Sequence, residues 1–207
     1  ILNMAMLNEI DILAITDHNS TKQLQVIETL QESYDFIVIP GVEVSVKEGF
    51  DCLCYFRNFE SAKKFNHLLE SNLSNEWKNY TPDDQVITDI YDNTFETYNK
   101  PLLSTTLDYK TLYLEVKKLD GAIVLAHVNR PSCTPLSVYE LKDIEFDGIE
   151  ISPYKRDEFI AANPNLKDYL IFHNSDSHSL LQLHDKQFSL NLKEKSIKGF
   201  FDYLVGE

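Results

Sequence analysis

The sequence has few of the residues that several common kinds of site require. Glycine occurs only six times in 207 residues, and no glycine-rich phosphate loop of either common type is present. A dinucleotide-binding fold is therefore disfavoured. The three cysteines, Cys52, Cys54 and Cys133, have no spacing typical of a zinc site or a disulfide framework. They indicate reduced thiols and a cytoplasmic protein. No apolar run approaches the length of a membrane span, so no membrane partner is predicted.

Positive charge is also scarce. The chain has 19 Lys and Arg against 33 Asp and Glu, which gives a formal net charge of −14. Such an acidic surface repels a long phosphodiester backbone, so we expect no duplex DNA binding through a basic patch. A mononucleotide or a short oligonucleotide stays open as a ligand, because a bound metal ion can supply positive charge locally.

Residues 12–20 read Ile-Leu-Ala-Ile-Thr-Asp-His-Asn-Ser, an apolar run that leads directly into polar residues. A short apolar run is typical of a strand that is buried on both faces. Asp17 and His18 would then follow the end of a strand, where α/β proteins place their ligands and chemistry. The alternative is a polar turn in which Asp17 or Asn19 caps the next helix.

Apolar runs and helical patterns alternate along the chain. The predicted strands cover residues 10–15, 36–40, 42–46, 50–56, 122–126, 149–152 and 169–172, with a last strand over 188–192. The predicted helices cover residues 21–32, 59–73 and 109–119, and a closing helix begins near Ser196. This alternation predicts an α/β fold with a mainly parallel sheet.

The length of the chain predicts one domain over residues 1–207. Residues 74–109 are the least regular part of the sequence, and we expect an insertion over one face of the domain there. Within it, Thr81-Pro82-Asp83 is typical of a helix start, because proline is favoured at the first helical position.

Acidic residues and histidines recur at the ends of the predicted strands. They are Asp17, His18, Glu43, His127, Glu150, Asp176 and His178. If the strands form a barrel, these side chains converge on one mouth. Converging imidazoles and carboxylates suit a site for several divalent metal ions. Each residue taken singly is more often a loop residue than a ligand, but their recurrence predicts a metal centre.

Five short motifs, in this order, resemble the PHP family, which is named for polymerase and histidinol phosphatase. They are Ile-Thr-Asp-His-Asn-Ser at 15–20, Pro-Gly-Val-Glu-Val-Ser at 40–45, Leu-Ala-His-Val-Asn-Arg at 125–130, Gly-Ile-Glu-Ile at 148–151 and Asn-Ser-Asp-Ser-His at 174–178. The resemblance implies a distorted (β/α)7 barrel with up to three zinc, manganese or iron ions, and phosphoester hydrolysis by metal-activated water. It also implies metal ligation by His18, Glu43, His127, Asp176 and His178, with Glu43 as the bridging ligand.

Two features depart from the family pattern. The His-x-His strand that opens the family is not present in this sequence, so the barrel is expected to miss its first strand here and to hold fewer ions. We expect an upstream segment of on the order of 20 residues in the natural protein, because a strand as apolar as residues 10–15 is a poor sheet edge. Where many members have a histidine after the glutamate motif, this chain has Asp51, which can still ligate a metal.

Four residues are predicted to act on the substrate. Asp17 and His178 are the predicted catalytic residues, because a carboxylate or an imidazole can transfer protons. Asn19 and Arg130 are predicted to bind the substrate. The planar guanidinium of Arg130 can grip a phosphate, although an ordinary surface salt bridge explains this arginine equally well. Lys155 and Arg156 fit a solvated helix start better than an anion site.

Together these features predict a cytoplasmic, metal-dependent phosphoesterase. The expected substrate is a small phosphate monoester, a nucleotide or a short oligonucleotide. Two alternatives stay open: a PHP-like domain that binds a ligand or partner without turnover, and a metallohydrolase that acts on a substrate without phosphate.

Overall fold

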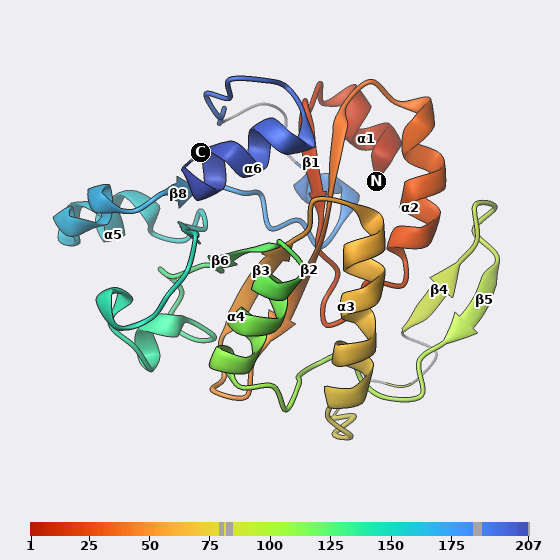
Figure 1. Cartoon of the computed structure of the whole chain (residues 1–207), viewed down its shortest axis with the longest axis horizontal. Helices are drawn as coiled ribbons and strands as arrows, with labels where there is room; N and C mark the ends of the chain where they lie inside the picture. The colour runs from red at the N-terminus through yellow and green to blue at the C-terminus, as the bar shows by residue number, and fades with distance from the viewer. Residues whose placement is uncertain (79–80, 82–84, 184–187, 207) are drawn as a thin grey trace.

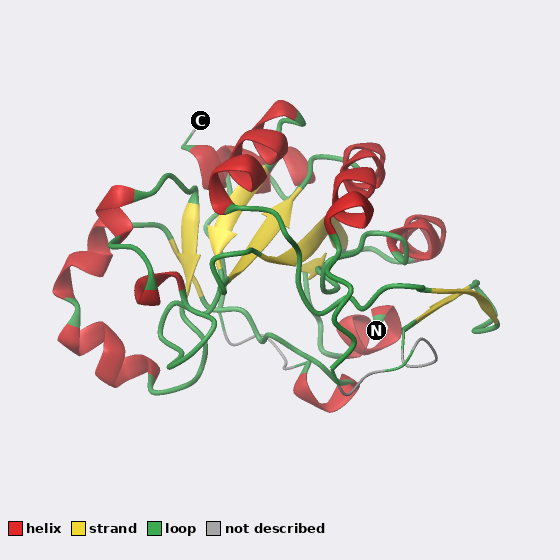
Figure 2. Cartoon of the chain, turned by 90° about the horizontal axis from the view of Figure 1, so that it is seen from below, coloured by secondary structure: helices red, strands yellow, loops and turns green. Residues whose placement is uncertain are grey.

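The computed structural model describes residues 1–78, 81, 85–183 and 188–206. Its main feature is a six-stranded sheet in the order β1-β2-β3-β6-β7-β8. The strands are β1 (Ile12–Ile15), β2 (Ile37–Ser45), β3 (Asp51–Tyr55), β6 (Ala122–Leu125), β7 (Gly148–Glu150) and β8 (Ile171–Phe172). Figure 2 shows that the sheet curls into half a barrel.

One strand of the sheet runs against the others. β1 and β2 are parallel, and so are β6, β7 and β8, but β3 is antiparallel to both of its neighbours. In the register of the sheet, Asp51 lies opposite Ser45, and Cys52 lies opposite Leu125. The first residue of β3 therefore lies at the edge where the parallel strands end. We call this edge the carboxyl edge.

Helices cover both faces of the sheet. One face is packed by α1 (Leu2–Leu7), α2 (Leu24–Leu30), α3 (Phe59–Asn72) and α4 (Tyr109–Lys118). The opposite face packs against α6 (Ile197–Val205), and we call it the α6 face. Figure 1 shows α3 and α4 in front of the sheet and α6 above it. Because side chains alternate along a strand, Val42 and Val44 meet the first layer of helices, whereas Ile39 meets α6.

Side chains that precede three of the helices fix where those helices begin. Asn58 accepts a hydrogen bond from the N–H of Ser61 (2.8 Å) at the start of α3, and Asp108 accepts one from Thr111 (2.8 Å) at the start of α4. Ser196 accepts one from Gly199 (2.9 Å) and caps α6 as expected. The helix predicted over 21–32 starts later in the structure: α2 begins only at Leu24, after Gln23, without a side-chain cap, so the alternative in which Asp17 or Asn19 caps it is wrong.

The predicted irregular insertion contains a β-hairpin that the sequence did not reveal. Its strands are β4 (Val86–Thr88) and β5 (Thr94–Thr97), and they project from the body of the molecule in Figures 1 and 2. The Asp89 carboxylate closes the turn by accepting hydrogen bonds from the N–H groups of Tyr91 (2.8 Å) and Asn93 (3.0 Å). Strands of three and four residues are too short to show a clear alternation of apolar and polar residues.

The remaining elements are short. Among the described residues they are α5 (Arg156–Ala162) and the 3-10 turns at Gln31–Ser33, Pro135–Ser137, Leu141–Asp143, Pro164–Asp168 and Leu180–Gln182. Within the part of the chain that the structure describes, no helix is both long enough and apolar enough to cross a lipid bilayer.

The structure confirms a mixed α/β fold, while the complete seven-fold barrel and the single domain over residues 1–207 stay predictions. The predicted strand over 188–192 is wrong, because these residues form no strand. Leu190 and Leu192 instead pack against the core beneath α6. The predicted helix start at Thr81-Pro82-Asp83 extends outside the described residues.

The apolar core beneath α6 should be a main source of stability. Phe201 is 0% exposed, and the guanidinium carbon of Arg57 lies 4.6 Å from the centre of its ring. We expect Phe201→Ala to lower the free energy of unfolding by about 3–5 kcal/mol, because it leaves a cavity in a packed core. Denaturant unfolding followed by circular dichroism measures this loss.

The matched control is Phe95→Ala on β5, where the phenylalanine is 60% exposed. This variant should change the free energy of unfolding by less than about 1 kcal/mol. Equal losses in the two variants would contradict the assignment of Phe201 to the core.

Candidate metal centre

The pleat of the sheet places several acidic side chains on the α6 face at the carboxyl edge. Glu43 follows Ile39 by four positions on β2, and Asp51 precedes Leu53 by two on β3. Ile39 and Leu53 both belong to the core beneath α6, so Glu43 and Asp51 share that face. The antiparallel β3 thus brings Asp51 next to Glu43, which lies on the neighbouring strand.

His127 joins these carboxylates through an unusual backbone conformation. Val124 and Ala126 face α6, so a continued strand would turn residue 127 to the opposite face. The φ angle of His127 is 29°, which ends the alternation. Its Nε2 atom lies 3.2 Å from Oε1 of Glu43 and 3.5 Å from Oδ2 of Asp51. Non-glycine residues with positive φ are strained and cluster at functional sites.

Glu43, Asp51 and His127 form the group that we call the acidic triad. All three are buried, and their ligand atoms lie within 4.8 Å of one another. Burial raises the pKa of the Asp51 carboxyl, and the adjacent Glu43 carboxylate raises it further. Burial also acts to raise the pKa of Glu43, but the hydrogen bond with His127 and the nearby His18 lower it overall. The triad therefore has two close carboxylates whose repulsion a positive charge must offset.

The donor set of the triad fits a divalent metal ion. A positive charge between the three groups offsets the repulsion of the carboxylates, and burial on the α6 face limits competition from water. Two carboxylates and one imidazole suit zinc, manganese or iron. The triad is thus the part of the predicted ligand set that the structure brings together most closely.

His18 and His178 lie at the mouth of the same site. Nε2 of His18 is 3.9 Å from Oε2 of Glu43, and the rings of His18 and His178 have centres 5.8 Å apart. The main chain around His18 is bridged to β2, because the N–H of Asn19 donates to the carbonyl of Glu43 (2.8 Å). Both imidazoles are partly exposed to solvent.

Asp176 lies outside the triad and forms an ion pair with the guanidinium of Arg130. Its Oδ1 atom is 3.7 Å from Nδ1 of His178. Like His127, Asp176 has a positive φ angle, of 47°. Ligation by Asp176 and phosphate binding by Arg130 both stay predictions, and the two side chains are neighbours.

The two remaining predicted site residues have different surroundings. Asp17 lies just beyond the end of β1, where its surroundings raise the pKa of its carboxyl by desolvation, and its catalytic role stays a prediction. Asn19 is 1% exposed, and its side chain accepts from the N–H of Ser45 (2.9 Å) and donates to the carbonyl of Leu102 (2.9 Å). These contacts favour a role for Asn19 in holding the loop rather than the substrate.

The structure gives contacts to further residues at the carboxyl edge. Glu150 is 2% exposed and accepts hydrogen bonds from His127 and Asn174. Asn129 donates to the carbonyl of Ser152 (2.9 Å). The sequence grouped Glu150 with the strand-end residues that predict a metal centre but did not name it as a ligand, and it gave Asn129, within the 125–130 motif, no role of its own. Lys155 precedes α5, and the guanidinium of Arg156 lies over the ring of Phe188. A further histidine, His184, lies outside the described residues.

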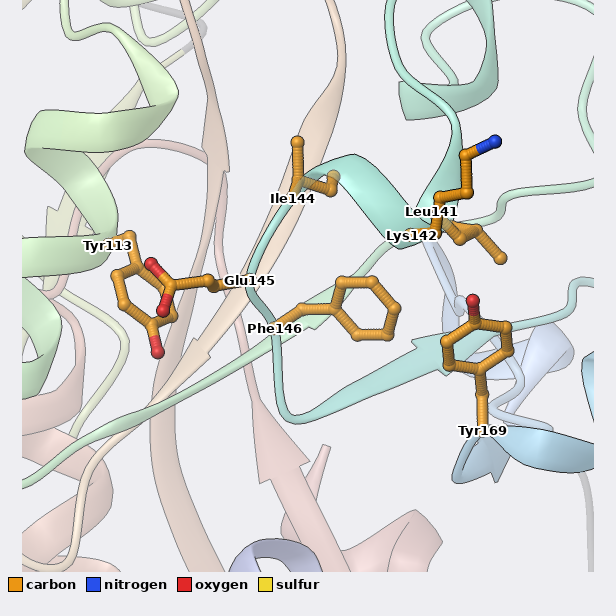
Figure 3. A pocket seen from close by; sticks show the side chains of 7 residues that line it. All are labelled: Tyr113, Leu141, Lys142, Ile144, Glu145, Phe146 and Tyr169. Atoms are coloured by element: carbon orange, nitrogen blue, oxygen red, sulfur yellow. The ribbon is translucent and has the colours of Figure 1, made fainter.

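A hollow of about 410 Å³ lies at the opposite edge of the sheet. Figure 3 shows its lining, which includes Tyr113, Leu141, Phe146 and Tyr169. Phe146 and Tyr169 precede β7 and β8, so the hollow lies where these strands begin. It is therefore separate from the acidic triad.

Known proteins resemble this chain in structure, whereas comparison of sequences finds no match. No protein-family model and no curated protein matches the sequence. The lesion-specific endonuclease PfuEndoQ from Pyrococcus furiosus has a similar structure, with a TM-score of 0.65 and 17% identity over 99% of this chain and 50% of that chain. An endonuclease Q bound to a 27-mer duplex with an abasic lesion has a TM-score of 0.62 and 16% identity over the same shares of the two chains.

A proposed metal-dependent phosphoesterase from Bifidobacterium adolescentis is also similar, with a TM-score of 0.56 and 15% identity over 98% of this chain and 88% of that chain. The present chain spans about half the length of the endonucleases, 50% in each case. At these identities the likeness is one of fold. The chain therefore shares its fold with structures that include a nuclease and a proposed phosphoesterase.

Proposed function

We propose that the protein is a metal-dependent phosphoesterase. The observation that carries the proposal is the acidic triad, whose ligand atoms lie within 4.8 Å of one another at the carboxyl edge of the sheet. In α/β folds this edge is where ligands bind and catalytic residues gather. The similar structures include an endonuclease and a proposed phosphoesterase, both of which fit hydrolysis of a phosphoester.

The residues around the triad have distinct roles in this proposal. Glu43, Asp51 and His127 would hold a divalent ion, which when bound lowers the pKa of a coordinated water and polarises a phosphoryl oxygen. Asp17, just beyond the end of β1, would accept a proton. His178, at the mouth, would donate a proton to the leaving group. His18 would complete the ligand set from the side of Glu43.

The negative charge of the chain limits the range of substrates that it can bind. With a net charge of −14, the protein repels a long nucleic acid unless a local positive charge intervenes. Arg130 supplies such a charge beside Asp176. We therefore propose a small phosphate monoester, a nucleotide or a short oligonucleotide as substrate. The duplex with an abasic lesion belongs to endonuclease Q, and this chain covers only 50% of that protein.

One observation favours the alternative of a domain that binds without turnover. Arg130 pairs with the carboxylate of Asp176, which therefore has a cationic partner already and lies apart from the triad. A site that holds fewer metal ions than hydrolysis requires would bind a phosphate without turning it over. Binding of phosphate with no turnover of p-nitrophenyl phosphate would select this alternative.

The first test of the proposed function compares two histidines. We expect His127→Ala to lower both the manganese content and the hydrolysis of p-nitrophenyl phosphate, by at least about 100-fold in rate, because the triad loses its nitrogen ligand. His67→Ala is the matched control, since His67 is exposed on α3 and outside the site. Elemental analysis and a colorimetric assay measure the two effects. Full metal content in the His127 variant would contradict the assignment of the ligand.

The second test concerns Arg130. We expect Arg130→Lys to raise the KM for a phosphate substrate by about tenfold, because lysine keeps the charge but loses the planar, two-pronged contact. Steady-state kinetics with p-nitrophenyl phosphate measure the change. Unchanged kinetics would place Arg130 among residues that only pair with Asp176.

A further inference from the structure

We propose that Glu150 is the positioning residue of the metal centre, because it fixes the main chain of His127 so that the imidazole faces Glu43 and Asp51. The proposal deepens the proposed function and rests on it. It does not make Glu150 a ligand or a catalytic group. It assigns to this carboxylate the task of holding a ligand in place.

Glu150 joins the ends of three strands. Its Oε2 atom accepts a hydrogen bond from the N–H of His127 (2.9 Å), just beyond β6. Its Oε1 atom accepts one from the side-chain amide of Asn174 (2.8 Å), just beyond β8. Its main-chain carbonyl also accepts a hydrogen bond from the N–H of Val128 (2.9 Å). With only 2% of the residue exposed, these bonds form where water does not compete.

The imidazole of His127 depends on this support. A histidine that binds a metal usually donates its other ring N–H to a carboxylate or a carbonyl, and that bond orients the ring. In His127, the Nδ1 atom is buried and has no hydrogen-bond partner among the described residues. The direction of the ring is therefore set by the main chain, whose φ of 29° is strained, together with the contact between Nε2 and Glu43. Glu150 binds the N–H at the start of this strained unit.

The Glu150 carboxylate also connects the loop after β6, which carries His127, with the loop after β8, which carries Asp176 and His178. Asn174 stands two residues before Asp176 and four before His178, the predicted ligands that follow β8. Through Asn174 and His127, Glu150 holds the loops beyond β6 and β8 in one arrangement. Both of its oxygen atoms already accept hydrogen bonds, which fits a positioning role.

Two variants separate the reach of the side chain from its charge. Glu150→Gln keeps the length but removes the charge. Its amide oxygen can accept from His127, and its NH2 can donate to Asn174 once the Asn174 amide has turned over. Glu150→Asp keeps the charge but is one methylene shorter, so it cannot reach both donors.

The matched control is Asp147→Ala at the other end of the same strands. Asp147 accepts a hydrogen bond from the N–H of Ile123 (2.7 Å) where β6 begins, as Glu150 does from His127 where β6 ends. It also pairs with Lys117 (2.6 Å). Removing the Asp147 carboxylate should lower the free energy of unfolding and leave Co²⁺ binding unchanged.

Binding of Co²⁺ alone, measured by calorimetry and by its visible absorption spectrum, is the first measurement. We expect Glu150→Asp to weaken Co²⁺ binding by about 10–100-fold, the usual loss when a contact that orients a ligand is removed. Glu150→Gln and Asp147→Ala should bind Co²⁺ as the unchanged protein does. Loss of binding in the Gln variant, or wild-type binding in the Asp variant, would overturn the proposal.

Hydrogen exchange of the His127 amide is the second measurement and needs no metal. We expect slow exchange in the unchanged protein and in Glu150→Gln, and fast exchange in Glu150→Asp, because the shorter side chain releases the N–H. Equal exchange in all three would overturn the positioning role. An unchanged protein that binds no Co²⁺ would contradict the proposed function instead, and the exchange data would still decide the role of Glu150. If Glu150→Asp does not fold, exchange of the His127 amide in the unchanged protein decides: slow exchange supports the hydrogen bond to Glu150, and fast exchange overturns it.

Discussion

The structure of the site depends on two carboxylates that are held close together where water is scarce. Glu43 and Asp51 lie on neighbouring antiparallel strands and face the same side of the sheet, so their repulsion must be offset by a positive charge. His127 brings its imidazole to both of them at the cost of a strained φ angle. The antiparallel β3 places Asp51 at the carboxyl edge, and Glu150 binds the main-chain N–H of the strained His127.

Much of this arrangement could be predicted from the sequence, because buried strands announce themselves as apolar runs and their last residues are then known. His18, Glu43 and His127 were identified in this way, Asp51 came only from the family resemblance, and Glu43, Asp51 and His127 form the triad. The conformation of His127 could not be predicted, since a single φ angle leaves no trace in the pattern. The role of Glu150 was also hidden, because hydrogen bonds across three strands are set by register rather than by local sequence.

The hairpin formed by β4 and β5 also could not be predicted from the sequence. Its segment of the chain contacts the residues that follow His18. Residues just after His18 bind the insertion in succession: Asn19 contacts Leu102, Ser20 contacts Tyr98, Lys22 contacts Glu96 and Gln23 contacts Thr88. Short strands with few apolar residues gave no signal, whereas tertiary contacts make the hairpin regular. The insertion thus anchors the loop that carries His18, and α3 anchors it further through the bond from Thr21 to Asn66 (2.9 Å).

The central claim is that a divalent ion binds between Glu43, Asp51 and His127. The most direct measurement is the anomalous scattering of crystals soaked in Mn²⁺, collected where manganese absorbs. The account predicts an anomalous peak within coordination distance of all three side chains, with His18 at the edge of the same site. Full occupancy of Mn²⁺ at another position, or no anomalous peak at the triad, would contradict it.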